Sequence, residues 1–177
     1  MNSINTIAKS DIIKAAIQKY NSYDSEWEKA YFDELSGGYN VYHINHNFSK
    51  KGGGGDAEIT VGKILAKYNG KQVEFLPEGG KKSPDVKFDN KTWDIKLIDN
   101  ANETTIRNNI KDARKAENVI FYWDYSIEKL EYLRSAIIRE VGRHRKYNRT
   151  HEIPNIYYIE KNGLLMLLWE KQKGLNK

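Results

Sequence analysis

The sequence predicts a mixed α/β fold in which a central sheet is flanked by helices on both faces. Apolar residues at helical spacing alternate along the chain with short alternating or apolar runs that are typical of strands. The run at residues 118–123 is almost wholly apolar, as expected for a strand buried on both faces. Turn residues at 89–91 and 161–163 join neighbouring strands into hairpins.

The first fifty residues are predicted to form a small helical extension, and residues 51–177 the main domain. A helix is expected at 10–20, where Ser10-Asp11 can cap it, and a second at 25–35, ended by Gly37-Gly38. A strand follows at 39–44. The glycine-rich run at 50–55 is interpreted as a linker or flap, because the Gly-x4-Gly-Lys-[Ser/Thr] pattern of a phosphate-binding loop is absent.

The main domain is predicted to alternate helices with strands and hairpins. In chain order the expected elements are a helix at 57–69, a strand at 72–76, a hairpin at 85–88 and 92–97, a helix at 103–116, a strand at 118–123, a helix at 127–145 and a hairpin at 156–160 and 164–169.

Composition excludes several classes of protein. With 39% hydrophobic and 30% charged residues in 177, the chain is typical of an ordinary globular protein and not of a disordered one. It contains no cysteine, which excludes disulfides and cysteine-based zinc sites. No signal-peptide pattern and no apolar run of membrane-spanning length is found, so no membrane partner is expected. A net charge of +5 favours a polyanionic partner.

The hairpin carries the residues on which a chemical function can be based. Period two places Asp94 and Lys96 on one face of the second strand and apolar side chains on the other. Asp85 opens the first strand, where a tight hairpin brings it next to Asp94. Two carboxylates can hold a hard divalent cation such as Mg²⁺ or Mn²⁺, and a lysine beside them can stabilise charge on a phosphate. The same residues in a surface hairpin would make only a weak ion pair.

The spacing Pro-Asp-x8-Asp-x-Lys resembles that of the PD-(D/E)XK, or restriction-endonuclease-like, nuclease superfamily. Residues 56–123 look like the C-terminal tRNA-nuclease toxin domains of contact-dependent growth inhibition (CdiA) proteins, through the helix that ends in Asn-Gly, the Ser-Pro-Asp motif and Trp-Asp-Ile-Lys. The resemblance implies that Glu58, Asp85 and Asp94 hold Mg²⁺ or Mn²⁺ and that Lys96 is the catalytic lysine. A carboxylate at a helix N-terminus, as for Glu58, is also favoured by the helix dipole.

Two other acids compete with Glu58 for the third position. Glu74 lies on an alternating strand and Glu78 in a loop, and for both a solvated surface position is the alternative.

Two groups of residues are candidates for contact with a nucleic acid. The helix expected after the Asp-x-Lys strand opens with Thr104, Thr105 and Arg107, a possible phosphate clamp. The later helix presents Arg139, Arg143 and Lys146 on one face. Helix capping and solvation are the alternatives for both. His43 and His46 are three residues apart but lack further zinc ligands, although His46 could act on a substrate if the flap closes.

The resulting hypothesis is a metal-dependent endonuclease, most simply a tRNA-cleaving toxin that acts in the cytoplasm and is blocked by a cognate immunity protein. A DNA endonuclease of the same fold (a junction resolvase, restriction or repair enzyme) and a non-catalytic nucleic-acid-binding module are the alternatives. The resemblance also implies delivery as the tail of a larger secreted protein. Whether the chain is free-standing or cut from such a protein stays open, as do the oligomeric state and the number of metals.

Overall fold

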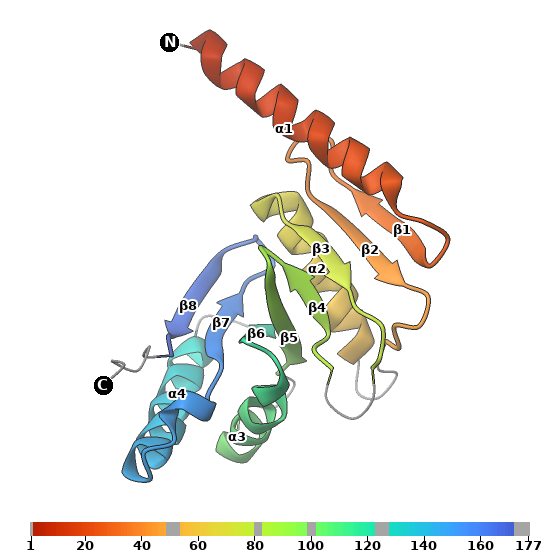
Figure 1. Cartoon of the computed structure of the whole chain (residues 1–177). Coiled ribbons are helices and arrows are strands. Elements are labelled where there is room, and N and C mark those ends of the chain that lie inside the picture. The colour runs from red at the N-terminus through yellow and green to blue at the C-terminus, as the bar shows by residue number, and fades with distance from the viewer. Residues whose placement is uncertain (1, 49–53, 80–82, 99–101, 123–127, 172–177) are drawn as a thin grey trace, which may run out of the picture.

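The computed structural model describes residues 2–48, 54–79, 83–98, 102–122 and 128–171, and within them the mixed α/β prediction is confirmed. The strands form one eight-stranded sheet in which spatial order follows chain order (Figure 1). Its strands are β1 (Trp27–Phe32), β2 (Tyr39–His43), β3 (Gln72–Phe75), β4 (Val86–Phe88), β5 (Lys91–Leu97), β6 (Asn118–Tyr122), β7 (Asn155–Ile159) and β8 (Leu165–Trp169). The helices are α1 (Asn2–Ser22), α2 (Gly54–Asn69), α3 (Glu103–Asp112) and α4 (Glu128–Lys146), with 3-10 turns η1 (Ala113–Lys115) and η2 (Thr150–Glu152).

Helices cross over wherever neighbouring strands are parallel. α2 connects the parallel strands β2 and β3, α3 connects β5 and β6, and α4 connects β6 and β7. The remaining neighbours are antiparallel: β1 with β2, β3 with β4, β4 with β5, and β7 with β8. Parallel pairs need such long connections, whereas antiparallel pairs can be joined by short turns.

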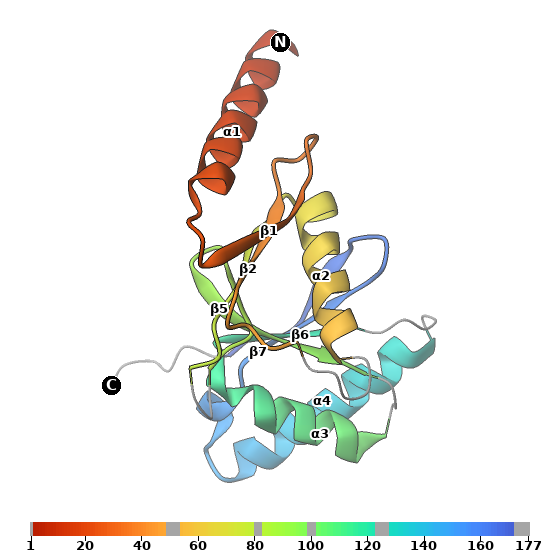
Figure 2. The ribbon, with the colours of Figure 1, turned by 90° about the vertical axis from the view of Figure 1, so that its right-hand side faces the viewer.

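The sheet separates two hydrophobic cores, one on each face. α2 covers one face and packs on Phe75, Trp93 and Ile95, while α3 and α4 cover the other (Figure 2). β6 contributes to both, because Ile120 points into the first core and Phe121 into the second. The prediction that this strand is buried on both faces is therefore confirmed.

The helix predicted at 25–35 is wrong, because these residues form β1 and the turn that follows it. The extended conformation is stabilised by pairing with β2 and by ring contacts of Trp27 with Tyr23 and His43. The turn is fixed by Asp33, whose carboxylate accepts a hydrogen bond from the Ser36 amide, and by Gly37 at φ 74°. The N-terminal extension is thus a helix followed by two strands, and not helical throughout.

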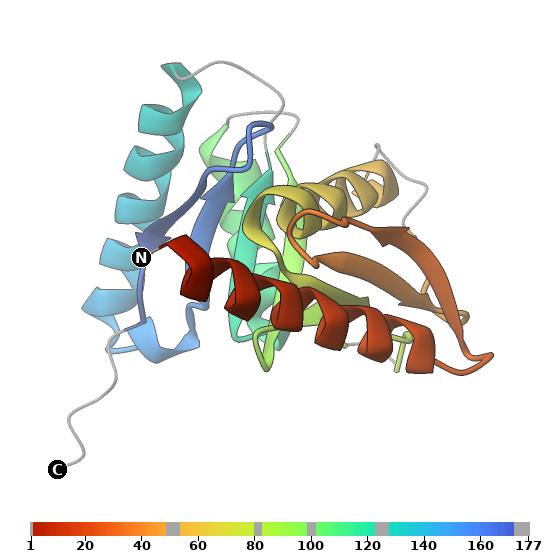
Figure 3. The same cartoon turned by 90° about the horizontal axis from the view of Figure 1, so that it is seen from above.

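The N-terminal extension is joined closely to the rest of the sheet. β2 pairs directly with β3 across the boundary proposed near residue 50. The C-terminal turns of α1 pack on the sheet through Tyr20, whose ring lies 5.3 Å from those of Phe32 and Tyr39, while the rest of the helix projects away (Figure 2). Seen from above, α1 runs across the β1–β2 end of the molecule (Figure 3). The division into domains at residue 50 stays a prediction.

The remaining predicted elements are confirmed with small shifts of their ends, α1 being longer than expected. The β4–β5 turn contains Asp89 and Asn90, both at positive φ, and Gly163 at φ 91° forms part of the last hairpin turn. The proposed flap at 50–55 falls largely on residues 49–53, and Ser126, expected to cap α4, lies in the gap at 123–127, so both lie outside the described residues. None of the described helices combines the length and apolar character that crossing a membrane requires.

Candidate active site

The β4–β5 hairpin brings Asp85 and Asp94 together, as predicted. The tight turn pairs Val86 with Trp93, which places Asp85 opposite Asp94. The Asp85 amide lies 3.4 Å from Asp94 Oδ1, to which it donates, and the Ile95 amide donates to Asp85 Oδ2 at 3.0 Å. Both carboxylates are therefore fixed by the backbone of the hairpin itself.

Asp94 is the buried centre of this pair. Its side chain is completely inaccessible to solvent, and its Oδ2 accepts no hydrogen bond. Lys96 Nζ lies 3.3 Å from that oxygen and 3.7 Å from Asp85 Oδ2. This oxygen is therefore balanced by the charge of Lys96 without a well-formed hydrogen bond, and part of the cost of burying the carboxylate remains.

Lys115 is a second lysine at the pair, and it was not predicted. Its Nζ lies 3.1 Å from Asp85 Oδ1 and 3.5 Å from Asp94 Oδ1, whereas Lys96 approaches the Oδ2 atoms of both. No local motif marks it in the sequence. β5 and β6 are parallel with Trp93 beside Asn118, and this pairing brings the segment just before β6 to the hairpin.

The cluster shifts the pKa values of its members. Burial, followed by the charge of Asp85, raises the pKa of Asp94 from its ordinary value to about 6. Burial alone would lower the pKa of Lys115, but the carboxylates of Asp85 and Asp94 raise it above its ordinary value. The hairpin thus holds a carboxyl group that binds its proton unusually tightly between two ammonium groups.

Glu58, in the first turns of α2, is nearly buried and paired with His46. His46 Nε2 lies 3.2 Å from Glu58 Oε2, and Nδ1 lies 2.6 Å from the Leu76 carbonyl oxygen. That oxygen can only accept, so Nδ1 carries a proton. Burial lowers the pKa of His46, but its hydrogen bonds to Glu58 and to the Leu76 carbonyl raise it to a net value above normal.

A polar cavity of about 200 Å³ joins Glu58 to the acidic pair. Its lining combines the predicted acids with neighbouring polar groups: His46, Asn47, Glu58, Leu76, Glu78, Ser83, Pro84, Asp85 and Lys115. Glu78 therefore lies at the same cavity as Glu58. Glu74 does not line it and instead accepts from the Tyr23 hydroxyl and pairs with Lys19 at 3.3 Å.

The predicted phosphate clamp at the start of α3 has another local role. Asn102 caps the helix by accepting from the Thr105 amide at 2.8 Å. Thr104 and Arg107 are exposed, and Thr105 is half-buried. Contact of these residues with a substrate stays a prediction.

Arg139 and Arg143, predicted to bind substrate, are held by an acid of the neighbouring helix. Arg139 lies 3.0 Å and Arg143 2.7 Å from the carboxylate of Glu103 in α3, and Arg143 also pairs with Glu140. Lys146 lies over the ring of Tyr147, 5.8 Å from its centre. These contacts tie α4 to α3, and the predicted role in nucleic-acid binding stays a prediction.

The donor chemistry of the hairpin fits a divalent cation. Mg²⁺ and Mn²⁺ prefer carboxylate oxygens, which Asp85 and Asp94 supply. Asp94 Oδ2 accepts no hydrogen bond but lies 3.3 Å from Lys96 Nζ. In the described part of the chain, however, no three His, Asp or Glu side chains gather as a set of metal ligands. The two lysines stand against the carboxylates instead, so a cation would have to displace or share them.

Comparison with known proteins gives one match. Residues 81–164 match the family described as the contact-dependent growth inhibition CdiA C-terminal domain. This span contains the hairpin, Lys115 and all of α4, and supports the resemblance inferred from the sequence. Searches of curated proteins and of solved structures returned no match.

Proposed function

We propose that this protein is a metal-dependent endonuclease that cleaves RNA, most specifically tRNA, as a toxin of the contact-dependent growth inhibition type. One observation carries the proposal: two carboxylates and two ammonium groups converge at the β4–β5 hairpin, one carboxylate oxygen being buried without a hydrogen bond. The similarity of residues 81–164 to the contact-dependent growth inhibition CdiA C-terminal domain supports the toxin part of the proposal.

The order of elements supports the superfamily assignment. The succession α2, β3, β4, β5, α3, β6, with β5 and β6 parallel, is the order expected of a restriction-endonuclease-like core. It places the Asp-x-Lys strand in the middle of the sheet and Glu58 at the helix that precedes it.

The proposed roles follow from the contacts. Asp85 and Asp94 would hold the metal ion, with Glu58 or Glu78 reaching it across the shared cavity. When bound, such an ion supplies Lewis-acid polarisation of the phosphate and lowers the pKa of a bound water. Lys96 and Lys115 place two positive charges beside the reacting phosphate, where they stabilise developing negative charge and orient the water.

The biological setting follows from the family resemblance. We infer delivery as the tail of a secreted toxin, action in the cytoplasm of the recipient cell, and neutralisation by a cognate immunity protein.

Cleavage assays test the proposal. Total tRNA, duplex DNA and junction DNA are incubated with Mg²⁺, Mn²⁺ or EDTA, using the wild type and Asp94→Asn. Asp11→Asn is the matched control, because Asp11 is an exposed carboxylate on α1 outside the cavity. We expect discrete tRNA products that require both the metal and Asp94, and unchanged cleavage by the control.

The other outcomes separate the alternatives. Cleavage of DNA alone keeps the chemistry and moves the role to repair or restriction. Binding of nucleic acid without any cleavage contradicts the catalytic assignment and favours the binding-module alternative.

A further inference from the structure

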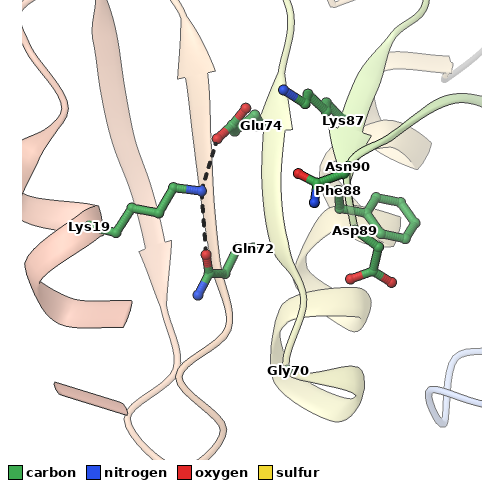
Figure 4. A pocket seen from close by; sticks show the side chains of 8 residues that line it. All are labelled: Lys19, Gly70, Gln72, Glu74, Lys87, Phe88, Asp89 and Asn90. Carbon is green, nitrogen blue, oxygen red and sulfur yellow. Dashed lines mark hydrogen bonds and ion pairs between the residues drawn. The ribbon is translucent and has the colours of Figure 1, made fainter. Parts of the chain in front are cut away.

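A second polar cavity, of about 310 Å³, lies between α1 and the β3–β4 strands (Figure 4). It is lined almost entirely by polar groups: Lys19, Gly70, Gln72, Glu74, Lys87, Phe88, Asp89 and Asn90. Figure 4 shows Lys19 reaching from α1 to Glu74 and Gln72 on β3, with Lys87 and Asn90 across from them. The cavity is distinct from the one that contains Glu58.

This cavity lies on the same sheet face as the catalytic acids. Val86 and Phe88 are buried in the core under α2. Because strand side chains alternate, Asp85 and Lys87 both point to the opposite face, about 7 Å apart along the strand. A nucleic-acid strand bound at Asp85 and Asp94 therefore passes Lys87 if it follows β4 toward its turn.

The acids of the cavity are already neutralised by neighbours within the protein. Glu74 accepts from the Tyr23 hydroxyl and pairs with Lys19. Asp89 pairs with Lys71 at 2.6 Å. These carboxylates therefore give the cavity little free negative charge.

Lys87 is the charged group of the cavity lining that has no partner among the described residues. Among the described residues its ammonium makes no hydrogen bond or ion pair, although it stands beside Glu74 in the register of β3 and β4. It is exposed and lines the cavity. Lys19 of α1, whose charge is offset by Glu74, lies 3.5 Å from the Gln72 side-chain oxygen. With Lys19 set against Glu74 and Lys71 against Asp89, the charge of the lining residues that has no opposite partner is the single positive charge of Lys87.

Building on the nuclease function proposed above, we propose that this cavity is a substrate subsite that binds a phosphate of the RNA strand flanking the cleaved bond. Lys87 is the principal phosphate contact, and Lys19, which also pairs with Glu74, lines the same cavity. The amides of Gln72 and Asn90 are polar partners for the sugar or base of the same nucleotide. The N-terminal helix thereby becomes part of the substrate-binding surface.

The test is the salt dependence of tRNA binding, measured in the Asp94→Asn protein so that no substrate is cut. Lys87→Gln is compared with Lys91→Gln, which removes the same charge from an exposed position of the same hairpin that does not line the cavity. Loss of one single-strand phosphate contact makes the slope of log K against log salt shallower by about 0.7. This corresponds to about fivefold weaker binding at ~0.1 M salt.

We expect the shallower slope and weaker binding for Lys87→Gln. Lys87→Arg, which keeps the charge, and Lys91→Gln should both retain the slope of the parent protein. Equal slopes for the two glutamine variants would overturn the subsite. Because binding is measured without cleavage, the two proposals fail separately. If the slope depends on Lys87 but the wild type cuts no nucleic acid, the subsite proposal stands and the nuclease proposal is refuted. If the wild type cleaves tRNA but the two glutamine variants have equal slopes, the nuclease proposal stands and the subsite proposal is refuted.

Discussion

Two regions of the molecule combine acidic and basic side chains, and they do so in opposite ways. At the β4–β5 hairpin, Asp94 is buried, one of its oxygens lacks a hydrogen bond, and its pKa is raised to about 6. Between α3 and α4, Glu103 accepts from Arg139 and Arg143, both at least half exposed. The first arrangement costs stability, and the second is an ordinary surface tie between helices. This contrast is consistent with the function proposed for the hairpin cluster.

The largest expected effect is on activity. Asp94→Asn is predicted to lower tRNA cleavage by about 10³-fold or more, because the buried carboxylate is lost from the reacting centre. The same change is predicted to increase the free energy of unfolding by about 1–3 kcal/mol above pH 7, since it removes a charge whose pKa lies well above normal. Cleavage rates and urea unfolding measure the two effects. A variant that is both inactive and less stable would contradict this account.

The pH dependence of stability should follow from the same group. The folded protein binds the Asp94 proton more tightly than the unfolded chain does, because burial raises the pKa from 3.8 to about 6. This contribution to stability is therefore complete below about pH 4 and is lost as the pH rises through 6.

The matching measurement is urea unfolding of wild type and Asp94→Asn at a series of pH values. The stability of the wild type relative to the variant should decrease by about 1–3 kcal/mol across this window. The pKa of His46 is also raised, so its contribution to the free energy of unfolding likewise falls as the pH rises. This contribution is the same in both proteins and cancels when their stabilities are subtracted. A difference that does not change with pH would refute the assignment.

Removing a lysine of the cluster should lower the free energy of unfolding, whereas removing Asp94 should raise it. Lys115→Gln leaves Asp85 and Asp94 with Lys96 alone and is predicted to lower the free energy of unfolding by about 1–2 kcal/mol, less than for a fully unpaired buried charge. Lys111→Gln, an exposed lysine on the same helical segment, is the control. Chemical denaturation of both variants measures the effect, and equal stabilities would show that Lys115 does not belong to the cluster.

The exposed ion pairs between α3 and α4 should contribute least to stability. Glu103→Gln removes the partner of Arg139 and Arg143 and is predicted to change the free energy of unfolding by less than about 1 kcal/mol, as is usual for exposed pairs. Denaturation at low and high salt measures it. A loss above about 2 kcal/mol would mean that the α3–α4 pairs resemble the buried cluster after all.

Much of the architecture could be predicted because it depends on local patterns. Alternation and turn chemistry predicted the β4–β5 hairpin, and with it the contact between Asp85 and Asp94. The β1 strand was missed because Trp27, Ala30 and Tyr31 also fit a helix, and only pairing with β2 decides between the two. Long-range pairing of this kind leaves no local trace.

The site was predictable where a motif carried it and not where the fold assembles it. Lys115 reaches the acids only through the parallel pairing of β5 with β6. The arginines of α4 had the spacing of a phosphate-binding strip, but their partner Glu103 is 36 residues from Arg139 in sequence. The ion pairs of a surface helix cannot be deduced from that helix alone.

The most direct test of the central claim, that the buried hairpin acids are kept to bind a cation, is thermal unfolding above about pH 7 with and without Mg²⁺ or Mn²⁺. KCl of matched ionic strength controls for screening. A cation that binds only the folded protein must raise its unfolding temperature. We predict such a rise for the wild type and for Asp11→Asn, and none for Asp94→Asn. Equal shifts in all three proteins, or none in the wild type, would contradict the claim.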